Sequence, residues 1–437
     1  MTAAKRMTRK VSINVVTLGC PKNTVDSEKI MGNLPADQFE VHHNSDKPTD
    51  IVLINTCGFI NDAKQESIDT ILQYVEAKKQ QQVKQVFATG CLAQRYKSEL
   101  ENEIPGIDGV MGFAEIPAWI REMTHAGSDL TSNRIITTPS HYAYLKIAEG
   151  CDRTCSFCAI PFIRGKNVSY PIEKVLEEAQ MLADKGVKEL IVVAQDTTYY
   201  GLDLYKKRRL AHLLEKLSDI KQFQWIRLHY AFPAGFPEDV LDVMRSRANI
   251  CKYLDIPLQH ISDGLLDSMR RALDSRSTIQ LLDNIRASVP GIHLRTAFIV
   301  GYPGETAQQF AELYQFIKQQ RFERMGVFNF SAEEGTAAAL LAPQISQRTK
   351  QSRLNKLMAL QQEISFSLNE AMVGNTYKVL VDRKENDFYV ARTEFDSPEI
   401  DNEVLIPAKK KLLIGEFYHV KITQAEAYDI CGEVTKA

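Results

Sequence analysis

The stretch EGCDRTCSFCAIPFIRG, residues 149–165, places three of the chain's eight cysteines within eight positions. Cys151, Cys155 and Cys158 are separated by three and then two residues. Three thiolates on one short loop can hold three corners of a cubane iron–sulfur cluster, for which cysteine is the usual ligand. The next cysteine in the chain is Cys251, so one iron would stay open to a substrate or cofactor. A structural zinc site is the alternative, but tetrahedral zinc needs four ligands, usually in two separated pairs.

Around this loop, residues 137–372 alternate short apolar runs with helical stretches. The pattern over 171–186 predicts a helix that ends at Gly186. Six strand–helix units of this length favour an incomplete (β/α)6 barrel, whose chemistry lies at the rim formed by the carboxyl ends of its strands. The expected strands are YAYLKIA (142–148), ELIVVAQ (189–195), QWIRLHY (224–230), KYLDIPLQ (252–259), HLRTAFIV (293–300) and MGVFNFS (325–331).

Polar residues and glycines follow several of these strands and are candidates for cofactor binding at the rim. They are Gln195, Asp196, Arg227, His229, Gly301 and Gly304. A polar residue at a strand end can instead be buried and satisfied by hydrogen bonds. The Pro-Gly turn at 303–304 is by itself weak evidence, because such turns after strands are common.

The N-terminal segment, residues 1–130, is predicted to form a parallel α/β sheet. Cys20, Cys57 and Cys91 each fall at the end of an expected strand. The carboxyl ends of parallel strands share one edge, where ligands bind, so these cysteines could meet. A free cysteine is often a small packing residue, but three of them at one edge favour a second cluster, again with one open iron. The expected strands are 14–20, 50–59 and 84–91, with a helix over 61–79.

The C-terminal segment, residues 373–437, contains about five short β-runs separated by turn residues, which predicts a small antiparallel β-barrel with a binding surface. A helical connection over 343–374 precedes it, and a polar linker over 125–140 separates the first two segments. Cys251 and Cys431 lie inside strand-like runs and are expected to be packing residues.

The chain's bulk properties limit its class. With 437 residues, 44% hydrophobic and 25% charged, it is expected to form two or three globular domains. No apolar run is long enough to cross a bilayer, and no signal-peptide pattern is recognisable, so a cytoplasmic location without membrane contact is expected. In a reducing compartment, clustered cysteines bind metal more often than they form disulfides. The net charge of −2 argues against a general nucleic-acid coat.

The sequence Cys-Asp-Arg-Thr-Cys-Ser-Phe-Cys at 151–158 resembles the C-x3-C-x2-C signature of radical S-adenosylmethionine (SAM) enzymes. The resemblance implies a 4Fe-4S cluster whose open iron binds SAM, which is cleaved to a 5′-deoxyadenosyl radical that abstracts hydrogen. The hard chemistry then belongs to the cofactor, and the protein positions it. The stretch GYPGE at 301–305 resembles that family's loop after the fifth strand.

Together with LGCPKNTVDSEK (18–29), NTCGFINDAKQESID (55–69) and TGCLAQRY (89–96), the chain resembles radical SAM methylthiotransferases over its whole length. GCPKNTVDSE and ARTEFDSPEID (391–401) are most similar to the branch that modifies an aspartate of small-subunit ribosomal protein twelve. This resemblance implies two 4Fe-4S clusters, a TRAM-like C-terminal domain that grips the substrate, and insertion of a methylthio group at the aspartate β-carbon. One SAM would methylate a cluster-bound sulfur and another would provide the radical, with an electron donor and a sulfur donor as partners.

Two other functions remain open. The tRNA adenosine methylthiotransferase branch would share every cysteine, but a module that grips RNA is expected to be basic. Residues 375–437 carry nine Lys and Arg against twelve Asp and Glu, a net charge of −3, which favours a basic ribosomal protein. An acidic surface that only aids solubility is the simpler reading, and the run Lys409–Lys411 keeps RNA contact open. A non-catalytic iron–sulfur protein that binds the ribosome would explain the barrel but not a polar rim beside an open-iron loop.

Overall fold

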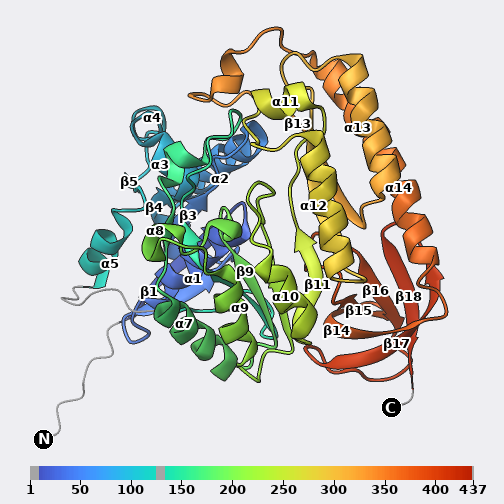
Figure 1. Ribbon diagram of the computed structural model, residues 1–437. Coiled ribbons are helices and arrows are strands. Elements are labelled where there is room, and N and C mark those ends of the chain that lie inside the picture. Colours follow the sequence, from blue (N-terminus) through green and yellow to red (C-terminus); the bar gives the residue numbers. More distant parts are fainter. Residues whose placement is uncertain (1–8, 125–132, 436–437) are drawn as a thin grey trace, which may run out of the picture. The chain divides into compact units, whose positions relative to one another are not determined.

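The computed structural model describes residues 9–124 and 133–435, which form two compact units (Figure 1). The first unit comprises the described residues up to Thr137 together with Ala159–Gly165. The second comprises Thr138–Cys158 and the described residues from Lys166 onward. The expected central and C-terminal segments therefore share one compact unit, except that Thr137 and Ala159–Gly165 of the expected central segment belong to the first unit. The expected boundary at residue 130 and the first half of the linker lie outside the described residues.

The first unit contains a parallel five-stranded sheet in the order β2-β1-β3-β4-β5. Alternate residues of β3 pack into apolar cores on the two faces, Val52 and Ile54 into one and Ile51 and Leu53 into the other. The strands are β1 (Val11–Thr17), β2 (Phe39–His43), β3 (Thr49–Thr56), β4 (Val83–Thr89) and β5 (Gly109–Val110). The helices are α1 (Pro21–Gly32), α2 (Asn61–Lys79), α3 (Gly90–Arg95), α4 (Lys97–Glu103), α5 (Ile116–Thr124) and α6 (Ile160–Arg164).

The three expected strands of this sheet form, and two edge strands join them that the apolar pattern did not indicate. Strand β2 buries only Phe39 fully, and β5 has only two residues, so neither leaves a strong apolar run in the sequence. Strand β1 ends at Thr17, before Gly19, whose φ of +91° turns the chain toward α1.

The second unit begins with an open, parallel six-stranded sheet in the order β13-β12-β11-β10-β9-β6, which agrees with the expected partial barrel. Helices α13 and α14 lie side by side, and α14 runs along β13 (Figure 1). The strands are β6 (Tyr142–Lys146), β9 (Glu189–Val193), β10 (Trp225–Leu228), β11 (Ile250–Asp255), β12 (His293–Val300) and β13 (Arg324–Asn329). The helices are α7 (Ile172–Asp184), α8 (Leu202–Tyr205), α9 (Leu210–Ser218), α10 (Asp239–Ser246), α11 (Asp263–Ser268), α12 (Ser275–Ser288), α13 (Ala307–Gln320) and α14 (Gln347–Glu370), with 3₁₀ turns η1 (Thr197–Tyr199) and η2 (Ala337–Leu340).

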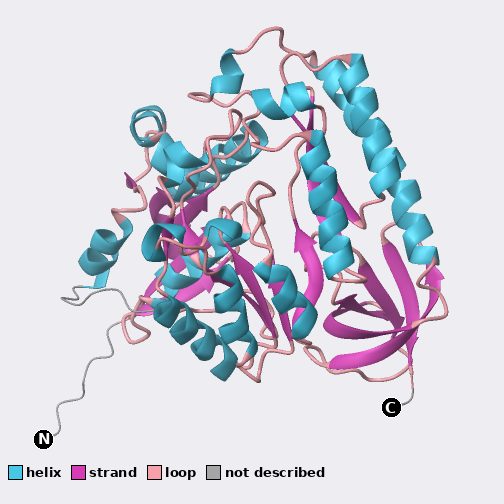
Figure 2. Ribbon diagram, in the orientation of Figure 1, coloured by secondary structure: helices cyan, strands magenta, loops and turns pink. Residues whose placement is uncertain are grey.

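The five C-terminal strands, magenta at the end of the chain in Figure 2, close into a barrel in the order β14-β15-β16-β18-β17. One pair corrects the expectation of a wholly antiparallel barrel: β16 and β18 run parallel, because β17 lies between them in the chain and reverses its direction. The barrel packs on the six-stranded sheet, where the rings of Trp225 and Phe417 meet at 4.8 Å. The strands are β14 (Thr376–Glu385), β15 (Phe388–Thr393), β16 (Glu403–Pro407), β17 (Phe417–Ala425) and β18 (Asp429–Val434).

None of the described helices combines the length and apolar character that crossing a bilayer requires.

Candidate metal and cofactor sites

The central cysteine loop lies after β6, between the short paired strands β7 (Ala148–Glu149) and β8 (Val168–Ser169). Its three cysteines are free of disulfides and partly exposed. The backbone N–H of Cys158 donates to the carbonyl of Cys155 at 3.2 Å, so the loop folds back on itself. Burial raises the pKa of the Cys151 thiol to about 11. Metal binding at this loop would therefore have to displace a tightly held proton.

Ser156 anchors the middle of this loop. Its backbone N–H donates to Met269 O at 3.1 Å, and its hydroxyl lies 2.7 Å from Ser268 O and 2.8 Å from the Tyr302 hydroxyl. Tyr302 belongs to the GYPGE stretch after β12. That stretch therefore supports the cysteine loop through a side chain.

Three buried polar atoms beside the loop have no hydrogen-bond partner: Gln195 Oε1, Arg153 Nη2 and Arg271 Nε. Gln195 Nε2 donates to Glu149 at 2.6 Å, and Arg271 Nη1 donates to the Cys155 sulfur at 3.4 Å. Buried polar groups in folded proteins are nearly always paired. The unpaired atoms therefore fit a polar ligand next to the cysteines, as a SAM-binding cluster site requires.

Asp196 positions one of these arginines. Its carboxylate accepts Arg153 Nε at 2.7 Å and the Thr198 N–H at 2.9 Å, which caps η1. The guanidinium groups of Arg153 and Arg271 both lie against the ring of Phe232, at 4.0 and 4.1 Å. Asp196 thus acts on the expected site through Arg153.

The two glycines after β12 differ in their surroundings. Gly301 has a φ of +71°, and a β-carbon there would lie 2.2 Å from Lys350 Cγ. Packing against Lys350 therefore accounts for this glycine. Gly304 has a φ of +79°, and nothing would lie within 4 Å of a β-carbon there. Only Gly304 leaves the open space expected where a cofactor approaches the backbone.

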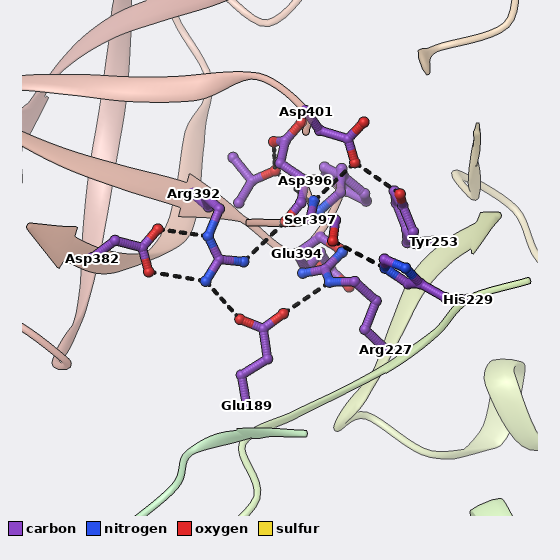
Figure 3. Close-up of polar contacts among 12 residues, drawn as sticks. Glu189, Arg227, His229, Tyr253, Asp382, Arg392, Glu394, Asp396, Ser397 and Asp401 are labelled. Carbon is purple, nitrogen blue, oxygen red and sulfur yellow. Dashed lines mark hydrogen bonds and ion pairs between the residues drawn. The ribbon is translucent and has the colours of Figure 1, made fainter. Parts of the chain in front are cut away.

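Arg227 and His229 bind a segment of the β-barrel region (Figure 3). Arg227 Nη1 donates to Glu394 O at 2.7 Å, and the His229 ring lies 2.9 Å from the Ser397 hydroxyl. Both side chains are buried. These contacts are those of buried strand-end residues held by hydrogen bonds, although Arg227 Nη2 is buried without a partner.

Arg227 also belongs to a buried network of charges (Figure 3). Glu189 accepts Arg227 Nε at 2.8 Å and Arg392 Nη2 at 2.7 Å, and Arg392 Nε reaches Asp382 at 2.5 Å. Burial opposes ionisation of Glu189, but the two arginines outweigh it and lower its pKa. This network joins the start of β9 to strands β14 and β15 within the second unit.

The second cysteine trio lies at one edge of the first unit's sheet. Cys20 caps α1 after β1, Cys57 follows β3, and Cys91 is the second residue of α3 after β4. Strands β1, β3 and β4 are neighbours in the sheet. The structure thus brings together the three cysteines that the sequence places 34 and more residues apart.

Glycines let the three loops approach one another. A β-carbon on Gly19 would lie 2.8 Å from Cys57 Cβ and 2.9 Å from Cys57 Sγ. One on Gly58 would lie 2.7 Å from the backbone of Leu92, the neighbour of Cys91. Each cysteine loop therefore contacts the next at a distance that a larger residue would not allow.

Asn23 and Ser67 hold these loops in place. The buried Asn23 amide donates to Leu18 O at 2.8 Å and to Thr56 O at 3.1 Å, joining the ends of β1 and β3. The Ser67 hydroxyl accepts the Cys57 N–H at 2.9 Å and donates to Cys57 O at 2.8 Å. Both residues lie in the motifs quoted for the family resemblance, but the sequence did not indicate their roles.

Arg164 is a further residue that the sequence reasoning missed. It lies in α6, and its Nε donates to the Cys91 sulfur at 3.4 Å. Burial raises the pKa of the Cys91 thiol, and Arg164 opposes this shift. Burial also raises the pKa of Cys57 to about 11. Arg164 belongs to the quoted loop sequence, so its position just after the cysteines was the available signal.

The donor spacing distinguishes a cluster from a single ion. In the described part of the chain, no three His, Cys, Asp or Glu side chains lie close enough together to bind one metal ion. The ligands of a four-iron cluster bind separate irons and are spaced more widely. Cys251 is buried beside Trp225 and Tyr253, as a packing residue should be, and Cys431 lies in β18.

Comparison with known proteins agrees with this arrangement. The Radical SAM superfamily model matches residues 145–317, the model described as Uncharacterized protein family UPF0004 matches 12–112, and the TRAM domain model matches 373–435. The methyltransferase TsrM from Kitasatospora setae has a similar fold, with a TM-score of 0.54 and 12% identity over 87% of this chain and 81% of that one. Fold and cysteine loop therefore define a radical SAM enzyme, a class that uses a 4Fe-4S cluster and SAM.

Full-length relatives place the chain within that class. It is 51% identical to the ribosomal protein uS12 methylthiotransferase RimO of Cytophaga hutchinsonii, over 98% of this chain and 99% of that protein. It is 52% identical to RimO of Flavobacterium johnsoniae, over 97% and 98%, and 50% identical to RimO of Phocaeicola vulgatus, over 98% and 100%. The chain belongs to the RimO family of radical SAM methylthiotransferases.

Proposed function

We propose that this protein inserts a methylthio group at the β-carbon of an aspartate in ribosomal protein uS12. One observation carries the proposal: each of the two parallel sheets has a cysteine trio at the carboxyl edge of its strands. The full-length relatives are ribosomal protein uS12 methylthiotransferases, which supports uS12 as the substrate.

The central trio, Cys151, Cys155 and Cys158, would hold the cluster that binds SAM. Gln195 Oε1 and the free edge of Arg153, both buried without a partner, would receive the polar groups of SAM. Asp196 would orient Arg153, and the open backbone at Gly304 would let the cofactor approach. The contacts of Arg227 and His229 suit support of the β-barrel region, and Gly301 packs against Lys350 of α14.

The N-terminal trio, Cys20, Cys57 and Cys91, would hold a second 4Fe-4S cluster. When bound, the two clusters and SAM would supply hydrogen abstraction from the substrate carbon and a methylated sulfur to replace that hydrogen. Asn23 and Ser67 would hold the loops that carry these cysteines in place through their hydrogen bonds to the loop backbone. Cleavage of SAM would need one electron from the reduced cluster, and bond formation between the substrate carbon and a sulfide-level methylthio group would return it. Each turnover uses one sulfur atom, so an electron donor that first reduces the cluster and a sulfur donor are the expected partners.

The net charge of the β-barrel region is weaker evidence for a protein substrate over an RNA substrate than its composition suggests. Three of its twelve acids are held in largely buried ion pairs, one of them with an arginine of the same region. When these three acids and that arginine are set aside, residues 375–437 carry nine acidic and eight basic side chains. The buried ion pairs are Asp382 with Arg392, Asp396 with Arg324, and Asp401 with Arg295. The choice of uS12 over tRNA therefore rests on the relatives.

A direct assay compares the two substrates. The anaerobically reconstituted protein is incubated with SAM, dithionite and sulfide, together with either a uS12 loop peptide or hypomodified tRNA. The expected product is the peptide heavier by a methylthio group in place of one hydrogen, located at the aspartate by fragmentation. Modification of the tRNA alone would overturn the substrate assignment.

The same assay tests the non-catalytic alternative. A protein that only binds the ribosome forms no 5′-deoxyadenosine. A Cys155→Ala variant serves as the control, since it removes one ligand of the SAM-binding cluster and should abolish 5′-deoxyadenosine formation.

A further inference from the structure

Arg164 makes an unusual set of contacts for a buried cation. Only 1% of its side chain is exposed, and its three donor nitrogens face three different acceptors. Nε donates to Cys91 Sγ at 3.4 Å, Nη1 to Asp26 at 3.0 Å and Nη2 to Asn23 Oδ1 at 2.6 Å. The guanidinium plane lies 4.4 Å from the ring centre of Phe113. All these residues belong to the first unit.

The contact with sulfur is the informative one. Arginine stays charged at every physiological pH and is chosen where its donors must keep a fixed geometry. Asp26 already neutralises the charge, and Asn23 satisfies a second nitrogen, so a purely structural ion pair would not need a third contact on a cysteine. The Nε–H of Arg164 donates to the Cys91 sulfur in a buried site, where charges act strongly.

We infer that Arg164 sets the reduction potential of the N-terminal cluster by placing positive charge and a hydrogen-bond donor on its ligand Cys91. This inference rests on the proposed second cluster. Hydrogen bonds to the sulfurs and net charge are main determinants of cluster potentials, and partners of the ligands tune a metal site. Reduction adds one electron to the cluster and breaks no bond, so a nearby cation stabilises the reduced form and raises the potential. The carboxylate of Asp26 acts in the opposite direction. Arg164 is thus a positioning residue rather than a catalytic one.

The second unit supplies a matched comparison. Arg271 also donates to a cysteine sulfur, Cys155, at 3.4 Å, and it also lies against a phenylalanine ring, that of Phe232. Its remaining contact is with the carbonyl of Pro257 at 2.6 Å. Substitution of Arg271 removes a similar side chain without touching the N-terminal cysteines.

The test isolates the N-terminal cluster in a variant with Cys151, Cys155 and Cys158 all changed to Ala. Reduction potentials are measured by dye-mediated titration with dithionite, followed by electron paramagnetic resonance. In this background we expect Arg164→Met to lower the equilibrium constant for reduction at least tenfold, which corresponds to about 59 mV for one electron.

Asp26→Asn should move the potential in the opposite direction, raising the constant for reduction severalfold, because it removes the opposing charge and keeps the side-chain shape. Arg271→Met, in the same background, should leave the potential unchanged. A role of Arg164 in packing alone predicts no such opposite shifts. If Arg164→Met loses iron, Arg164→Gln, which removes the charge but keeps a polar side chain, takes its place and should also lower the potential.

The outcomes separate the inference from the function on which it rests. A background variant that binds no iron overturns the second cluster and this inference with it. Iron retained in the background, with a potential that neither Arg164→Met nor Arg164→Gln lowers, overturns the role of Arg164 alone.

Discussion

Glu189 is the residue on which we expect a single neutral substitution to have the largest effect on stability. It is fully buried at the start of β9 and accepts hydrogen bonds from Arg227 and Arg392. Glu189→Gln keeps the shape and size of the side chain but removes its charge. Arg392 would keep Asp382 as a buried carboxylate partner, and Arg227 would lose the carboxylate with which it pairs.

The expected cost follows from these contacts. A pair of unit charges about 4 Å apart is worth about 4 kcal/mol at an effective dielectric constant of about 20. Glu189 takes part in two such pairs, and its neutralisation recovers several kcal/mol of its own desolvation. The net loss should be about 3–5 kcal/mol, the range for breaking a buried ion pair by removing one partner.

The assay uses the chain's two tryptophans, of which Trp119 lies in the first unit and Trp225 in the second. In a Trp119→Phe background, urea unfolding followed by fluorescence reports on the second unit through Trp225. Glu189→Gln should lower the midpoint clearly, whereas Glu385→Gln, at an exposed pair with Arg383, should cost at most about 1 kcal/mol. Equal midpoints for the two variants would refute the idea that the buried charges stabilise this unit.

Three further predictions concern the cysteine edge and the acid range. Cys57→Ala should reduce the iron of the reconstituted protein by roughly half, since it removes one of two cluster sites; unchanged iron content would exclude Cys57 as a ligand. Gly19→Ala should destabilise the first unit by about 1–3 kcal/mol and lower its iron content, because φ is +91° and Cys57 Cβ lies 2.8 Å away; Gly186→Ala, at the same φ with nothing within 4 Å, should leave iron unchanged. Burial opposes ionisation of Asp382, yet Arg392 brings its pKa from 3.8 to about 2. Its contribution, about 2 kcal/mol, is therefore complete above pH 4 and lost as the pH falls toward 2; acid titration of Asp382→Asn should lack this loss.

Much of the architecture could be predicted because its signals are local. The helix over 61–79 and the six central strands appear as periodic or apolar runs, and the structure contains α2 over Asn61–Lys79 and strands at all six places. Strand β2 left no such signal, because an edge strand with one buried residue does not differ from a polar loop. The parallel pairing of β16 with β18 likewise follows from barrel closure and leaves no trace in the sequence.

The side-chain roles at the barrel illustrate the opposite case. Arg227 and His229 follow the same pattern as Gln195 and Asp196, each pair lying at the end of an expected strand. Their partners, Glu394 and Ser397, are more than 160 residues away in the chain. No local pattern encodes such a contact.

By itself, the sequence determined which residues can carry the chemistry: the spacing of Cys151, Cys155 and Cys158 is a property of one loop, and parallel strands necessarily bring their carboxyl ends to one edge. Only the tertiary structure decided what surrounds those sulfurs, including Arg164 at Cys91. The physical reason is the distance along the chain over which each kind of interaction acts. Spacing and periodicity act through a few covalent neighbours, whereas buried charge partners are selected by packing between segments that the chain holds far apart.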